Sequence, residues 1–208
     1  MRYIRSMAST DDWSTRHSVL ANARRTAALI NVLTGTDDQP QPQPDAVAEV
    51  LRQYGELEPI EINSGDIARM RAAALLLREV FAAGHVDPAA EALNRLLLEH
   101  TGRLRLTSHG GSTPWHPHLD RHDDAPWDEW FLASSCLALT VLLWDRQRPP
   151  GGLCASPSCQ NVYVTQGPGP ARRYCSRRCA TRERVAAHRR GHQDGTSLSR
   201  ARESTGEA

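Results

Sequence analysis

The sequence predicts an α+β fold that is predominantly α: a helical body with one β-hairpin, followed by a small C-terminal module. Three observations support this. Apolar residues recur at helical spacing through most of residues 18–145, and the spacing changes to alternation only around residues 103–119. Four of the five cysteines lie between residues 154 and 179, in a segment too short to build a core of its own.

Four helices are expected before the hairpin. Each pairs an apolar stripe at i, i+3 and i+4 with a recognisable start or stop signal. The clearest start is at Asn63, where Asn-Ser-Gly-Asp supplies a capping side chain. Pro88 sits in the first turn of another helix, where proline is favoured. The expected helices cover residues 18–35, 46–54, 67–83 and 87–100, and a Pro/Gln-rich loop covers 36–45.

The hairpin and a long apolar helix complete the body. Residues 103–106 and 115–119 alternate as strands do, around a turn at Gly110 and Gly111. Residues 128–145 are densely apolar with acids at both ends, which is typical of a buried core helix. No apolar run reaches the roughly 20 residues that span a bilayer. The N-terminal stretch 1–14 carries early acids and no apolar segment, so we expect a cytoplasmic protein without a membrane partner.

The composition along the chain predicts four segments. We expect a flexible N-terminus at residues 1–17, a helical body at 18–148, a small finger at 153–192 and a disordered tail at 193–208. The Arg-Pro-Pro-Gly-Gly stretch at 148–152 resembles a linker between body and finger. The chain is therefore expected to have two parts that fold separately.

The cysteine spacing predicts one structural Zn²⁺ bound by Cys154, Cys159, Cys175 and Cys179. These residues form two close pairs with the stretch 160–174 between them, which matches the ligand spacing of tetrahedral zinc sites. Four thiolates leave no open position on the metal. Two disulfides would require an oxidising compartment, which nothing in the sequence indicates. His188 is an alternative ligand, but four cysteines already suffice, so we expect it on the surface of the helix.

The finger is expected to contain a knuckle, a short hairpin and a helix. Residues 162–164 form the first strand of that hairpin, residues 165–170 a loop and residues 172–174 the partner strand. The helix runs from Arg177 to about Arg190. Because the metal supplies the folding energy of such a module, Cys175→Ser should unfold the finger and leave the helices of the body intact.

The finger is also strongly basic. The chain has no lysine, and residues 171–192 hold eight arginines and one acid, a net charge of +7. Arginine binds phosphates and guanine edges in a bidentate manner, so these residues are candidate nucleic-acid contacts. A solvated helix and an acidic protein partner remain alternatives. The eight are Arg172, Arg173, Arg177, Arg178, Arg182, Arg184, Arg189 and Arg190.

With these features the segment resembles the CGNR-type zinc finger, whose second cysteine pair is followed by an arginine-rich helix. The signature Cys-Gly-Asn-Arg reads Cys179-Ala180-Thr181-Arg182 here. The body resembles the ABATE-type domain of stress-induced transcription regulators, on Ala28 to Leu33, the hairpin with Trp115 and the long apolar helix. The resemblance implies a bacterial transcription regulator that binds DNA. A homodimer, a small-molecule ligand of the body, and an RNA- or protein-binding module without sequence-specific DNA binding stay open.

Other polar residues in the body have weaker patterns. A second metal site is one interpretation of His109, His116, His118 and His122, near Asp120, Asp123 and Asp124. Cys136 is expected to be a buried core residue rather than a redox sensor. Asn31 either bonds within the core or lines a pocket. No phosphate-binding loop, nucleophile elbow or pair of catalytic carboxylates is present, so an enzyme is not expected.

Overall fold

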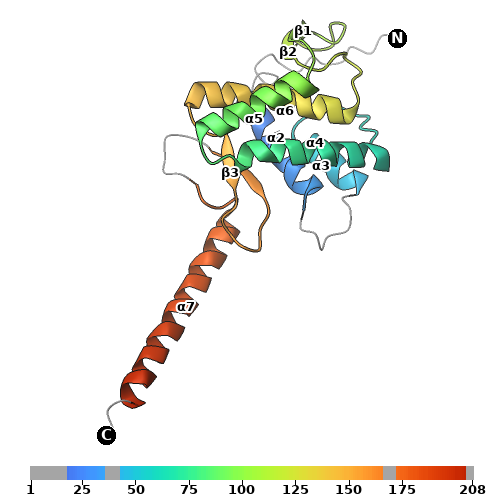
Figure 1. Cartoon of the computed structure of the whole chain (residues 1–208). Coiled ribbons are helices and arrows are strands. Elements are labelled where there is room, and N and C mark those ends of the chain that lie inside the picture. The colour runs from blue at the N-terminus through green and yellow to red at the C-terminus, as the bar shows by residue number, and fades with distance from the viewer. Residues whose placement is uncertain (1–17, 36–42, 166–171, 205–208) are drawn as a thin grey trace.

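The fold is a bundle of helices that carries two small hairpins and one projecting helix (Figure 1). The computed structural model describes residues 18–35, 43–165 and 172–204, with side chains up to Arg190. The predicted predominantly α class, with a helical body and a small zinc finger, is confirmed. The helices are α2 (Val19–Leu33), α3 (Pro44–Gln53), α4 (Ser64–Ala82), α5 (Val86–His100), α6 (Trp127–Arg146) and α7 (Arg177–Ser204).

The apolar helix α6 lies at the centre of the body. It packs against α2, α4 and α5, and α3 is held through α2. Phe131 and Leu139 of α6 are completely buried, and so is Cys136, which therefore has the predicted core position. Burial raises the pKa of the Cys136 thiol to about 12, so it stays protonated and unreactive near neutral pH.

The helix starts agree with the signals in the sequence. Ser18 caps α2 by accepting a hydrogen bond from the backbone of Ala21. At α4, Asn63 accepts hydrogen bonds from Gly65 and Asp66, and the Asp66 carboxylate accepts one from the backbone of Asn63. This capping box supplies partners for backbone N–H groups that the first turn leaves unpaired.

The two hairpins form separate two-stranded antiparallel sheets. In the first, β1 (Arg105–Thr107) pairs with β2 (His116–His118), and Thr107 lies opposite His116. In the second, β3 (Gly151–Leu153) pairs with β4 (Val162–Val164), and Gly151 lies opposite Val164. We call β1–β2 the outer hairpin and β3–β4 the inner hairpin.

The inner hairpin corrects two expectations. Gly151 and Gly152 belong to a strand rather than a linker, and this strand, not residues 172–174, pairs with β4. Glycine is needed in this strand because the chain is closely packed there. A Cβ at Gly151 would overlap the carbonyl oxygen of Tyr163 and the ring of Phe81. A position that only glycine can occupy resembles a flexible linker in sequence, although it is densely packed in the fold.

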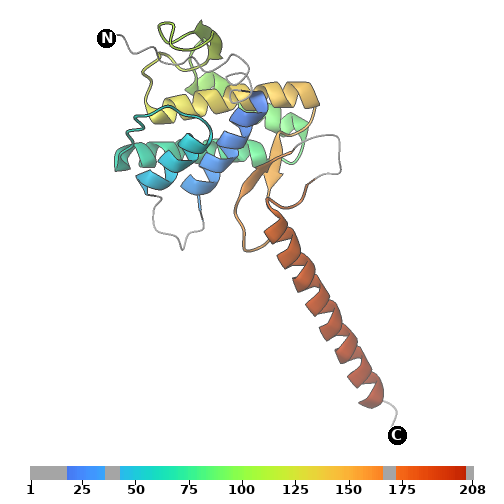
Figure 2. The same ribbon diagram turned by 180° about the vertical axis from the view of Figure 1, so that it is seen from behind.

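Helix α7 projects away from the bundle in both views (Figures 1 and 2). It was expected to end near Arg190, with a disordered tail from residue 193, but the helix continues to Ser204. No proline interrupts residues 191–204, and the two glycines there cost only about 1 kcal/mol each in a helix. The expectations for residues 1–17, 36–42, 166–171 and 205–208 lie outside the described residues.

None of the helices in the described part of the chain combines the length and the apolar composition that a membrane crossing requires.

Candidate metal centre

Four cysteine side chains converge between the inner hairpin and the start of α7. Cys154 directly follows β3, Cys159 ends the turn that comes next, and Cys175 precedes α7. Cys179 lies in the first turn of α7, so the helix brings it back toward Cys175. The four Sγ atoms all lie within 4.8 Å of one another, as the spacing predicted.

The sulfur positions fit one tetrahedral zinc ion. The Sγ atom of Cys175 is 3.6 Å from that of Cys159 and 3.6 Å from that of Cys179. With a Zn–S bond of about 2.3 Å, a regular tetrahedron places its sulfurs about 3.8 Å apart. Four thiolates complete the coordination, so this is a closed site for one structural zinc, whose role is to hold the fold together.

The thiols themselves show why a cation belongs there. Burial, together with the neighbouring thiols, raises the pKa of Cys175 to about 12. The Ser176 hydroxyl lowers the pKa of Cys179 to about 7 by hydrogen bonding to its thiolate. Four thiolates at this separation would repel one another, which favours the protonated thiols when no cation is present. A bound Zn²⁺ displaces those protons and coordinates all four sulfurs as thiolates.

Polar groups around the cysteines orient them. The backbone N–H of Cys175 points to the Sγ of Cys154 at 3.4 Å, and Arg182 donates to the Sγ of Cys179 at 3.4 Å. Arg182 also donates to the hydroxyl of Ser156 at 2.8 Å, and that hydroxyl donates to Glu183. The one acid of the arginine-rich segment is therefore turned inward and does not offset the charge on the outer face of α7.

The metal centre is attached to the body through the inner hairpin. Val162 and Val164 are almost fully buried and belong to the same hydrophobic core as the helices. The Asn31 side chain donates to the carbonyl of Val162 at 3.0 Å and accepts from its N–H at 2.7 Å. Arg78 of α4 donates to the carbonyl of Gln160. The boundary expected between residues 148 and 153 thus falls inside a shared core.

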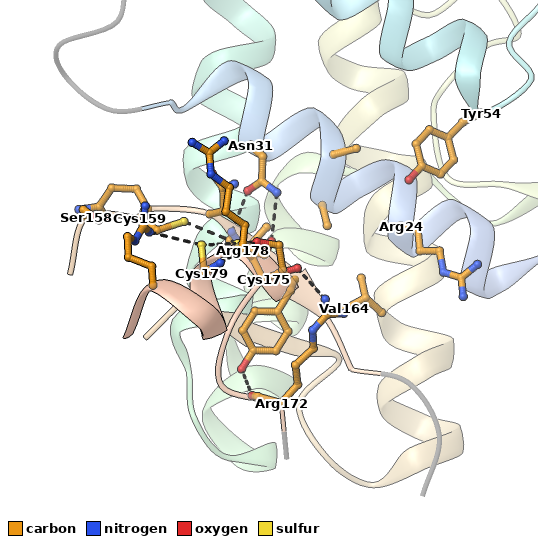
Figure 3. A pocket seen from close by; sticks show the side chains of 18 residues that line it. Arg24, Asn31, Tyr54, Ser158, Cys159, Val164, Arg172, Cys175, Arg178 and Cys179 are labelled. Carbon is orange, nitrogen blue, oxygen red and sulfur yellow. Dashed lines mark hydrogen bonds between the residues drawn. The ribbon is translucent and has the colours of Figure 1, made fainter. Parts of the chain in front are cut away.

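An open cavity of about 790 Å³ lies between α2 and the metal centre (Figure 3). Its walls contain Asn31 and Tyr54 from the body and Tyr163 from β4. Asn31 therefore satisfies both interpretations of the sequence, since it bonds to β4 and lines a pocket. Four arginines also line the cavity: Arg24, Arg172, Arg178 and Arg182.

The eight arginines of the finger fall into two groups. Arg172 and Arg182 form hydrogen bonds within the finger. Arg172 donates to the carbonyls of Tyr174 and Cys175, and Arg182 donates to the Sγ of Cys179. The side chains of the others are exposed and form no hydrogen bond or ion pair with the described residues. These six are Arg173, Arg177, Arg178, Arg184, Arg189 and Arg190.

Comparison with known proteins identifies the finger. The family model of the CGNR zinc finger matches residues 152–192, which contain all four converging cysteines. The segment is therefore a CGNR-type zinc-binding module, as its resemblance indicated. No curated protein matches the chain significantly.

Two features of the site were not evident from the sequence. Arg24 reaches the cavity from α2, which is far from the finger along the chain, and Arg182 turns back to the metal centre instead of pointing outward. By contrast, His188 is exposed on α7 and is not part of the cysteine cluster, as the sequence led us to expect. Sequence spacing places ligands within one short segment, but it cannot indicate which distant helix forms the opposite wall.

Proposed function

We propose that this protein binds duplex DNA through α7 and acts as a bacterial transcription regulator in the cytoplasm. The observation that carries the proposal is a projecting helix that holds exposed arginines from Arg177 to Arg190, beside a rigid metal centre. The major groove of B-DNA is about 12 Å wide and admits one α-helix. The zinc would fix the angle at which α7 leaves the body.

The distribution of arginines along α7 supports this mode of binding. Arg178, Val185 and Arg189 occupy positions i, i+7 and i+11, which lie on one face of a helix. Arg177 and Arg184 are related as i and i+7 on another face. A helix in the major groove meets base edges on one side and phosphates on its flanks, and exposed guanidinium groups suit both contacts.

The arginine-lined cavity offers a second contact for nucleic acid. Arg24 of the body and Arg178 of α7 both line it, although α2 and α7 are the first and last described helices of the chain. A phosphate held there would fix the register of α7 along the DNA backbone, since phosphate contacts position a protein without reading the sequence.

Salt-dependent binding tests the proposal. We expect binding of the full chain to duplex DNA to weaken linearly on a log–log plot against salt, by about 0.9 per phosphate neutralised. Replacing Arg178 and Arg189 together by alanine should reduce that slope by about 1.8. The matched control replaces Arg95 and Arg103, exposed arginines of the body, which removes the same charge at another place.

Three outcomes would contradict the proposal. Equal binding of duplex DNA, structured RNA and single strands, or no salt dependence, would favour the alternative module that binds RNA or protein. An equal effect of the two double variants would mean that only net charge matters. Genome-wide occupancy of the tagged protein tests the regulatory role itself. The proposal is for a binding protein and not an enzyme, so no turnover is expected.

A further inference from the structure

A second cluster of metal-ligating side chains lies in the outer hairpin, at the opposite end of the body from α7 (Figures 1 and 2). His116 and His118 are two residues apart on β2, so their side chains lie on the same face of the hairpin. His109 joins them from the connecting turn, where it has a left-handed backbone with φ of 48°. Their ligating ring nitrogens all lie within 4.8 Å of one another.

The spacing of the ring nitrogens fits coordination of a metal. The Nε2 atom of His116 is 3.3 Å from Nε2 of His109 and 2.9 Å from Nε2 of His118. With a Zn–N bond of about 2.0–2.1 Å, a tetrahedral site places its nitrogens about 3.3 Å apart. The rings are tilted or edge-on to one another, with centroids 4.7–5.1 Å apart, so they are not stacked.

The other ring nitrogens already have partners. Nδ1 of His116 lies 2.8 Å from the carbonyl oxygen of Pro114, which can only accept a hydrogen bond. Nδ1 of His118 lies 2.8 and 2.9 Å from the two carboxylate oxygens of Asp120. Both Nδ1 atoms therefore carry a proton, and in the neutral rings both Nε2 atoms present lone pairs. Two lone pairs that face each other at 2.9 Å repel, so either a metal ion or a shared proton must join the two atoms.

Carboxylates behind the rings complete the arrangement. Asp120 is almost fully buried, and Arg105 binds both Asp120 and Asp123. Asp123 also accepts from the hydroxyl of Thr107 at 2.7 Å and lies 3.6 Å from Nδ1 of His109. A carboxylate or carbonyl behind each ligating imidazole is the usual outer shell of a histidine metal site, because it holds the tautomer and the ring orientation.

We propose that His109, His116 and His118 form a second metal site, which binds one divalent late first-row transition ion such as Zn²⁺ through three Nε2 atoms. Imidazole suits zinc, copper, nickel and iron, and three protein ligands leave a coordination position open. The side chains of His109 and His118 are 29% and 11% exposed, so an ion can enter from solvent. This site is exchangeable, in contrast to the closed four-cysteine centre.

His122 supplies a matched control. It lies four residues beyond His118 and was grouped with the other three in the sequence, but it is exposed and is not part of the cluster. If surface histidines bound metal without a defined site, replacing His122 would reduce metal binding as well. Metal binding at the proposed site should not change when His122 is replaced.

The test counts zinc in the full chain whose cysteine centre already holds one ion. Titration with Zn²⁺, followed by calorimetry and by elemental analysis after gel filtration, should find a second equivalent in the wild type and in His122→Ala. His116→Ala and His118→Ala should retain one equivalent. Cobalt identifies the ligands, because the second Co²⁺ should add visible absorption without the thiolate-to-metal charge transfer that marks the cysteine centre.

A measurement on the wild type alone keeps the test valid if a histidine variant misfolds. In the wild type, the second equivalent of zinc should shift the ring nitrogen resonances of three histidines and slow amide exchange in residues 105–118. A wild type that binds only one equivalent would overturn the proposal, because a shared proton would then join His116 and His118. Loss of the second equivalent in His122→Ala would overturn it as well.

Discussion

The two hairpins have strands of the same length but are stabilised in different ways. The inner hairpin contributes Val162 and Val164 to the main core, and its first glycine fits against the ring of Phe81. The outer hairpin leaves Leu104 and Leu106 about two-thirds exposed. It is held by a polar network in which Arg105 joins the carboxylates of Asp120 and Asp123.

The difference explains what each metal centre can do. Removing zinc from the cysteine centre should expose core residues, so it should destabilise the helices of the body as well as the finger. The histidine cluster belongs to a hairpin that can open without disturbing the main core, so an ion there can come and go. Although burial by itself raises the pKa of Asp120, the hydrogen bond from His118 and the hydrogen bond and charge of Arg105 hold that pKa below its usual range. Asp120 therefore stays ionised behind the cluster.

The largest expected effect is that of Cys175→Ser. Structural zinc contributes about 10–16 kcal/mol in zinc-finger peptides, which is comparable to the total stability of a domain. Considered alone, the sequence suggested that only the finger would unfold. Because Val162 and Val164 belong to the core of the body, we now expect the Tm of the helices to fall by at least about 10 °C as well.

Circular dichroism at increasing temperature measures this effect. Ser158→Ala, an exposed change next to a ligand, is the control and should unfold as the wild type does. If Cys175→Ser loses its zinc and the helices melt at the wild-type temperature, then the two parts fold separately and the inner hairpin does not couple them.

Asn31→Ala should have an intermediate effect on the free energy of unfolding. The change leaves the N–H and C=O of Val162 without the partners that they have in the folded protein. Unpaired buried groups cost about 1–3 kcal/mol each, so we expect a loss of about 2–4 kcal/mol in urea unfolding. Asn94→Ala, on the exposed side of α5, should cost less than about 0.5 kcal/mol. Equal losses would show that the bidentate bond contributes nothing specific.

The smallest effect on global stability is expected for Arg105→Ala. The outer hairpin should open because Asp120 and Asp123 lose their common partner, while global unfolding changes by less than about 1 kcal/mol. Hydrogen exchange should show fast amides in residues 105–118 and unchanged protection in α6. The control is Arg121→Ala, which removes an exposed ion pair with Glu129. A large drop in global stability would place the outer hairpin in the main cooperative unit.

Local patterns were sufficient to predict most of the elements. Helical spacing and capping located four helices of the bundle nearly to their observed ends, as Asn63 at the start of α4 illustrates. The outer hairpin was also predicted, because alternation and a Gly-Gly turn are local signals. By contrast, the partner of β4 was predicted incorrectly, since strand pairing depends on packing against residues such as Phe81 that are distant in sequence.

The sequence by itself determined the four zinc ligands and the basic character of the finger. Both depend on residues close together in the chain, and thiolates spaced to meet at one ion need little help from the rest of the fold. Only the tertiary structure decided that the inner hairpin shares the core of the body and that Arg182 turns toward Cys179. It also decided that three of the four candidate histidines meet and His122 does not. These outcomes depend on how turns and helices orient side chains in space, which spacing along the chain does not specify.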